Sequence, residues 1–104
     1  ARKKWIISSL SSNGKIYIDH GAAKALNNGK SLLAAGIIKI EGIFEKGENI
    51  LILDENNKSL ARGLSSFTSS EINKIKGKQS KEIENILGYL SKSEIIHKDD
   101  MVKL

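Results

Sequence analysis

The sequence has 104 residues, no cysteine and two histidines, which excludes disulfides, metal–thiolate sites and thiol catalysis. Its length fits one domain with a small core and is too short for a nucleotide-binding kinase fold or a two-domain enzyme. Seventeen basic residues against twelve acidic ones give a net charge of +5, which suits an anionic partner but is also common in soluble domains. No apolar run approaches the roughly 20 residues of a membrane span. We therefore expect a cytoplasmic protein, or a piece of one, without a membrane partner.

Short strands and turns dominate the first half of the chain. Residues 15–19 alternate with period two, so Ile16 and Ile18 share one face of a predicted strand. The alanine-rich segment 21–26 predicts a short helix that ends at Asn27-Asn28-Gly29. Isoleucine and turn residues predict three further strands, at 37–41, 49–54 and 59–64.

Two short helices and two end strands are predicted in the second half. Thr68 and Glu71 have the spacing of a capping box, so a helix begins there and ends at Gly77. We expect Ser80 to cap the next helix and Gly88 to end it. Residues 94–97 and 101–104 resemble short strands. The pattern predicts an α+β domain around a small, twisted, partly closed β-barrel.

The barrel interior, or its wall, is predicted to contain four side chains of the central hairpin. These are Ile50, Ile52, Ala61 and Leu64.

No segment predicts catalysis or a metal site. Gly29-Lys30-Ser31 resembles the end of a phosphate-binding loop, but the glycine required five positions earlier is Lys24, and the segment follows a helix rather than a strand. His97, Asp99 and Asp100 are too few for an independent metal site and fit a solvated turn better. We therefore expect no catalytic residue and no bound metal in this chain.

Charge is unevenly distributed along the chain. Residues 41–55 contain five acids and one lysine, whereas residues 74–81 contain four lysines and no acid. The lysine run fits either a solvated helix end or a binding surface.

Two blocks, 18–26 and 29–37, resemble the start of a PUA domain. Further blocks at 41–48, 61–64, 86–89 and 94–99 are similar to the C-terminal PUA domain of bacterial glutamate 5-kinases. Ala34 departs from the resemblance, because that family usually has proline there. The resemblance implies a PUA-like pseudo-barrel of short mixed strands with a few short helices. It also implies a domain at 13–104, preceded at 1–12 by a linker from a kinase domain or by a first strand.

The resemblance also implies a function. A glutamate 5-kinase phosphorylates L-glutamate with ATP in the first step of proline biosynthesis, and its ATP and magnesium sites lie in an amino-acid-kinase domain that this chain lacks. The chain would then be a non-catalytic accessory domain with no cofactor of its own. Its partner would be that kinase domain, and oligomerisation stays open.

A second function is implied by PUA domains that bind structured RNA through the first helix and the glycine-containing loop after it. The positions carried over to this sequence are Lys24, Gly29, Lys30, Ser31 and Gly36. A regulatory accessory domain and an RNA-binding module, independent of the kinase or inside it, therefore stay open as alternatives. A small enzyme in its own right is the least supported of the three hypotheses.

Overall fold

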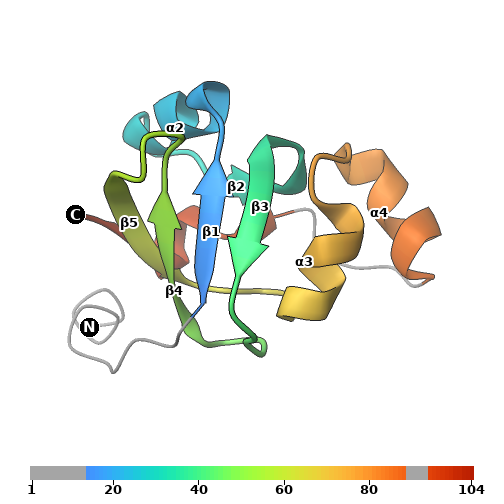
Figure 1. The fold of residues 1–104 in the computed structure, drawn as a ribbon. Coiled ribbons are helices and arrows are strands. Elements are labelled where there is room, and N and C mark those ends of the chain that lie inside the picture. The colour runs from blue at the N-terminus through green and yellow to red at the C-terminus, as the bar shows by residue number, and fades with distance from the viewer. Residues whose placement is uncertain (1–13, 89–93) are drawn as a thin grey trace.

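A computed structural model describes residues 14–88 and 94–104 (Figure 1). The predicted linker at 1–12 lies outside the described residues. The first half contains β1 (Lys15–Ile18), α2 (His20–Asn27), β2 (Leu32–Leu33), the 3₁₀ turn η1 (Ala34–Gly36), β3 (Ile37–Glu41), β4 (Asn49–Leu53) and β5 (Ser59–Leu64). The second half contains α3 (Ser69–Ile75), α4 (Ser80–Leu87), β6 (Glu94–Ile96), the 3₁₀ turn η2 (Lys98–Asp100) and β7 (Met101–Lys103).

The strands form two sheets. A five-stranded sheet has the order β3-β1-β4-β5-β7, and β2 pairs with β6 in a separate ladder. The β1–β4 pair is parallel, whereas β1–β3, β4–β5 and β5–β7 are antiparallel. Figure 1 shows α2 above one end of the sheet, and α3 and α4 beside β3. This mixed arrangement confirms the predicted α+β pseudo-barrel.

The core lies between the sheet and the surrounding helices. Ile50, Ile52 and Ala61 are fully buried, and Leu64 is half-buried at the wall, as the sequence predicts. Ile16 and Ile18 of β1 are also buried, as is Tyr17 between them. Other large buried side chains come from loops, helices and β6: Phe44, Phe67, Ile72, Ile75, Ile83 and Ile95.

Helix boundaries follow the predicted caps with one exception. The Glu71 N–H donates to Thr68 Oγ1 at 3.1 Å and the Thr68 N–H donates to Glu71 Oε1 at 2.9 Å, so the predicted capping box is confirmed. Ser80 was the wrong residue for the second cap. It is the first helical residue of α4, and the extended Gln79 before it is the N-cap, with its N–H donating to Glu82 Oε2 at 2.9 Å.

In residues 14–88 and 94–104, no helix is long and apolar enough to cross a membrane. The same residues contain no group of three or more histidines or acids placed to hold a metal ion.

Candidate nucleic-acid interface

The candidate site begins with α2, whose start and end are both determined locally. Asp19 is the N-cap, and its Oδ1 accepts a hydrogen bond from the Ala22 N–H at 2.8 Å. His20, the first residue of the helix, is exposed. The helix ends at Asn27, and Gly29, two residues later, has a φ of +77° that glycine adopts easily. The Lys30 N–H then donates to the Ala25 carbonyl at 3.0 Å, which holds the loop against the end of the helix.

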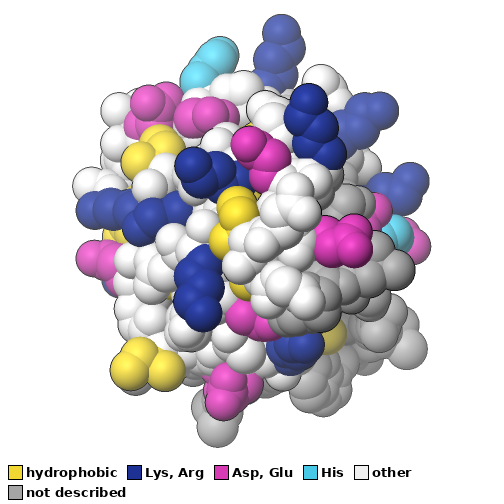
Figure 2. Space-filling model, turned by 90° about the vertical axis from the view of Figure 1, so that its right-hand side faces the viewer, with side chains coloured by type: hydrophobic (Ala, Val, Ile, Leu, Met, Phe, Trp, Pro, Cys, Tyr) yellow, Lys and Arg dark blue, Asp and Glu magenta, His cyan; other side chains and the backbone are white. Residues whose placement is uncertain are grey.

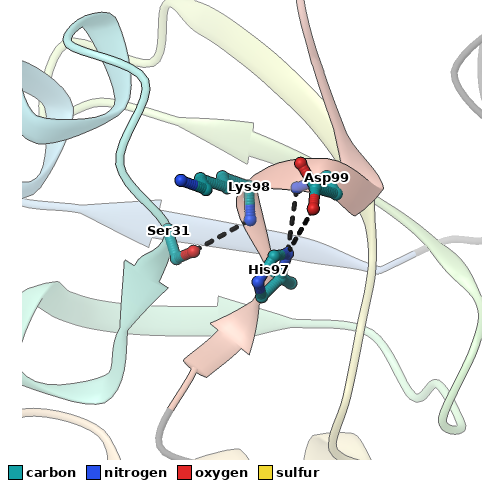
Figure 3. A network of polar contacts seen from close by, with 4 residues as sticks. All are labelled: Ser31, His97, Lys98 and Asp99. Atoms are coloured by element: carbon teal, nitrogen blue, oxygen red, sulfur yellow. Dashed lines mark hydrogen bonds and ion pairs between the residues drawn. The ribbon is translucent and has the colours of Figure 1, made fainter.

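The β2–β6 ladder joins this loop to the C-terminal part of the chain. Because Leu32 pairs with Ile96 in antiparallel register, residues just before Leu32 lie beside residues just after Ile96. The Lys98 N–H accordingly donates to Ser31 Oγ at 2.9 Å across 67 residues of sequence. Figure 3 shows this bond, and shows the Lys98 side chain extending toward the loop that leads into Ser31.

A cationic groove of about 580 Å³ lies between the α2 loop and the η2–β7 segment. Three lysines and one acid, Asp99, contribute to its wall, and the buried Leu26 and Met101 contribute apolar surface. Its full lining is Leu26, Gly29, Lys30, Lys98, Asp99, Met101, Val102 and Lys103. The ammonium group of Lys103 donates to the Asn27 carbonyl at 2.6 Å, at the C-terminal end of α2.

A second groove, of about 430 Å³, shares Lys30 with the first. Its surface is mostly apolar because small residues of α2 and η1 dominate the lining. It is lined by Asp19, Gly21, Ala22, Ala25, Lys30, Ser31, Leu33, Ala35 and Gly36.

The two glycines carried over from the resemblance have different physical roles. A Cβ on Gly29 would meet nothing within 4 Å, so glycine is favoured there by its positive φ alone. A Cβ on Gly36 would lie 2.4 Å from Cβ of Ala22, so Gly36 lets η1 pack closely on α2. That packing explains Gly36 without any ligand, and its predicted role in RNA binding stays a prediction.

The structure brings four of the five predicted site residues to the grooves. Gly29, Lys30, Ser31 and Gly36 contribute to the linings, whereas Lys24 is exposed on α2 and lines neither groove. The sequence reasoning missed Lys98 and Lys103. They lie about 70 residues away from Lys30, and no local pattern shows that they share its groove.

His97 caps the turn beside the groove. Its Nδ1 accepts a hydrogen bond from the Asp99 N–H at 3.1 Å, so this nitrogen caps η2. The Asp99 Oδ2 lies 3.6 Å from the same nitrogen (Figure 3). The predicted turn at 98–100 is thus a capped 3₁₀ turn.

A family model described as the PUA domain matches residues 14–87. This chain belongs to the PUA domain family. Curated relatives match this chain beyond the residues that the family model covers. The domain is 65% identical over 104 residues to a glutamate 5-kinase of Pelagibacter ubique, covering all of this chain and 28% of that protein. It is 49% identical over 102 residues to a glutamate 5-kinase of Bartonella henselae, covering 98% of this chain and 27% of that protein. The PUA domain therefore spans just over a quarter of the length of these relatives.

Solved structures of PUA domains have the same fold. A PUA domain of Aeropyrum pernix in a tartrate complex matches 81% of this chain and 42% of its own with a TM-score of 0.59 at 24% identity. A conserved PUA domain protein of Thermoplasma acidophilum matches 62% of this chain and 43% of its own at 26% identity, with a TM-score of 0.55. An H/ACA ribonucleoprotein bound to a substrate RNA matches 57% of this chain and 19% of its own at 27% identity, with a TM-score of 0.55.

Proposed function

We propose that this PUA domain is the non-catalytic accessory domain of a glutamate 5-kinase. The observation that carries the proposal is the 65% identity to such a kinase, which extends over the whole chain but covers 28% of the relative. The whole protein would use ATP and magnesium to convert L-glutamate to L-glutamate 5-phosphate, the first step of proline biosynthesis, in the cytoplasm. An amino-acid-kinase domain outside this chain would hold both cofactors.

The loop at Gly29-Lys30-Ser31 supports an accessory role. In phosphate-binding loops a strand precedes the glycine-rich turn and a helix follows it, so that the helix N-terminus faces the phosphate. Here α2 precedes the loop and the two-residue β2 follows it. The loop therefore lacks the helix N-terminus that would cradle a nucleotide.

The test compares glutamate-dependent ADP release by three proteins: this chain, the complete kinase and the kinase without this domain. We expect release from the complete kinase and none above background from this chain. A regulatory role predicts that removal of the domain changes the kcat or the KM for glutamate while the fold of the remaining protein is retained. Turnover by this chain alone would contradict the accessory role. Unchanged kinetics after removal would leave no regulatory function for the domain.

Structured RNA is a second candidate partner, favoured by the lysines that line the groove beside Lys30. Binding should weaken steeply with salt, because lysine–phosphate contacts release counterions. If Lys24 and Lys30 each contact one phosphate, the double variant Lys24→Ala, Lys30→Ala should reduce the log–log salt slope by about 1–2 units.

The matched control removes two lysines from another region, Lys74→Ala and Lys78→Ala, and lowers the net charge equally. A tRNA stem-loop titrated at two salt concentrations provides the measurement. No binding at low salt, or equal effects of the two double variants, would contradict RNA binding through Lys24 and Lys30 and leave the regulatory role.

A further inference from the structure

We propose that the outer face of the five-stranded sheet is a docking surface for residues 5–10 of the same chain. The outer face is the side of the sheet that points away from the core, and its central side chains are Tyr17, Leu51, Leu53, Arg62 and Val102. The predicted linker at 1–12 contains residues 5–10, so their docking would fix the path from a kinase domain to this domain. That consequence rests on the accessory function proposed above, whereas the docking itself does not.

The pairing of β1 with β4 separates the inner from the outer face. Ile16 pairs with Ile52, and both side chains lie in the core. Because side chains alternate along a strand, the next pair, Tyr17 with Leu53, points to the outer face. Neither of these two residues belongs to the core cluster.

A row of three further side chains crosses the outer face. Leu51 of β4 pairs with Arg62 of β5, and Arg62 pairs with Val102 of β7. Ala61 and Gly63, on either side of Arg62, are buried on the inner face. Figure 1 shows β2 behind the sheet and the helices at its end and side, so no helix of the described residues lies over the outer face.

Strand β4 is apolar on both of its faces. Residues 50–53 are four aliphatic side chains in a row, with Ile50 and Ile52 in the core and Leu51 and Leu53 on the outer face. Strands with one solvated face usually alternate apolar with polar residues, whereas strands covered on both faces are continuously apolar. Leu53 is 7% exposed and Tyr17 is 9% exposed. Burial outside the core cluster indicates a second apolar layer over this face.

Arg62 adds a polar group that requires an acceptor on the same face. Its Nη1 atom is buried and has no hydrogen-bond partner among residues 14–88 and 94–104. A buried guanidinium donor without an acceptor is costly, so such groups in folded proteins are normally paired. Residues 5–10 contain no acid, but their backbone carbonyls and the hydroxyls of Ser8 and Ser9 are acceptors. These acceptors fit a single guanidinium on an otherwise apolar face.

The chain that precedes β1 starts beside the outer face. The Gly14 carbonyl accepts the Leu51 N–H at 3.2 Å, which holds this point of the chain against β4. On the inner side, a Cβ at Gly14 would lie 2.5 Å from Cδ2 of Phe44 and 2.7 Å from Cδ1 of Ile50. Core side chains therefore fill the inner side, and the outer side is the one open to the preceding residues.

Residues 5–10 have the composition and the reach that this face requires. Four of the six are apolar, namely Trp5, Ile6, Ile7 and Leu10. The intervening residues 11–13 are two serines and an asparagine, which favour a turn. Six residues extended at about 3.3 Å each cover about 20 Å, which is enough to cross the five-residue β4.

The experiment uses Trp5, which is the only tryptophan of the chain and therefore reports on this segment directly. We expect its emission in the wild type to be blue-shifted from that of the guanidinium-unfolded chain and protected from acrylamide quenching. Leu51→Lys on the outer face should shift the emission to the red and remove the protection. The matched control Ile86→Lys adds the same charge at a partly exposed apolar position of α4 and should change neither. Circular dichroism verifies the fold of each variant.

A second variant changes the segment and leaves the sheet untouched, in case Leu51→Lys fails to fold. The double variant Ile6→Lys, Ile7→Lys should give the same red shift of Trp5. It should also move the amide resonances of Leu53 and Arg62, but not that of Ile72 in α3. Unchanged resonances of Leu53 and Arg62 would overturn the docking.

Wild-type emission at the wavelength of the unfolded chain, with full quenching, would overturn the docking and leave the outer face to a partner outside this chain. Emission that depends on protein concentration would overturn docking within one chain in favour of a second copy. Equal red shifts in Leu51→Lys and Ile86→Lys would also contradict the proposal. The ADP-release comparison does not depend on Trp5 emission, so failure of the docking and failure of the accessory function are distinguishable.

Discussion

Two groups of lysines in this domain differ in how their members come together. Lys74, Lys76, Lys78 and Lys81 are neighbours in sequence, yet they lie in α3, in α4 and in the connection between them. Lys30, Lys98 and Lys103 are far apart in sequence, yet they line one groove. Density of charge along a chain is therefore a poor guide to density of charge in space.

The first group shares its helices with polar and acidic side chains. Lys76 donates to Asn73 Oδ1 at 3.2 Å, and Glu71 and Glu82 lie in the first turns of the two helices. Figure 2 views the molecule from this side and shows basic side chains mixed with acidic ones over its surface. The second group is instead gathered by strand pairing, because β2–β6 and β5–β7 bring η2 and β7 to the α2 loop. Of the two groups, the second is the better candidate for anion binding.

The largest effect is expected from truncating Ile52, a side chain of the core on which both lysine groups depend. Ile52 has 0% exposure, and Ile52→Ala should lower the free energy of unfolding by about 2–4 kcal/mol because the lost methyl groups leave a cavity. Chemical denaturation measures this change. The matched control, Ile43→Ala, removes the same groups from a side chain that is 89% exposed and should change stability by less than about 0.5 kcal/mol. Equal stability of the two variants would mean that the strand register is displaced by one residue.

A second variant, Gly63→Ala, tests the position of the second lysine group without removing a charge. Gly63→Ala forces a Cβ against Ile96 and the Asp100 carbonyl, so we expect a loss of about 1–3 kcal/mol in stability and a displaced η2. RNA affinity should fall although every lysine is retained. Gly21→Ala is the control, because its Cβ would meet only Asp19 Oδ1 at 3.5 Å, and its stability should be unchanged or slightly higher. Unchanged stability and unchanged RNA binding in Gly63→Ala would contradict the packing of η2 on β5.

A third test distinguishes Gly29 of the first groove from Gly36 of the second. Gly29→Ala should cost about 1 kcal/mol through its positive φ, and Gly29→Asn should cost less because asparagine tolerates that conformation. At Gly36 the order should reverse, since the larger asparagine crowds Ala22 more than alanine does. Thermal unfolding of the four variants gives the ranking. The same order at both positions would show that conformation rather than space decides Gly36.

The smallest effect concerns a contact set by strand register alone. Tyr17 pairs with Lys39, and its hydroxyl donates to Glu41 Oε1 at 2.7 Å. This hydrogen bond to Glu41, aided by burial and by the carboxylate charge, raises the pKa of Tyr17 above its ordinary value. The contribution of the phenol to stability is therefore present below about pH 10 and is lost as the pH rises through the raised pKa. Wild type should exceed Tyr17→Phe in stability at neutral pH, and the difference should shrink in alkali. A constant difference across that range would contradict the contact.

Much of the fold was determined by short-range features of the sequence. The strands at 37–41 and 59–64, the capping box of Thr68 and Glu71, and the helix end at Gly88 all depend on residues within a few positions of one another. Propensity, capping and hydrophobic alternation act over such distances, so they could be predicted. The second cap was misplaced by one residue because Ser80 and Gln79 are adjacent and both are polar.

The candidate site was predictable only in part. The resemblance supplied Lys24, Gly29, Lys30, Ser31 and Gly36, whereas the partners of Lys30 in the groove, Lys98 and Lys103, depend on the tertiary structure. The reason for Gly36 was also hidden, because Ala22 lies against it only after α2 and η1 pack together. Side chains about 70 residues apart share a groove only when strand pairing brings their segments together. That pairing depends on long-range contacts that a local pattern does not contain.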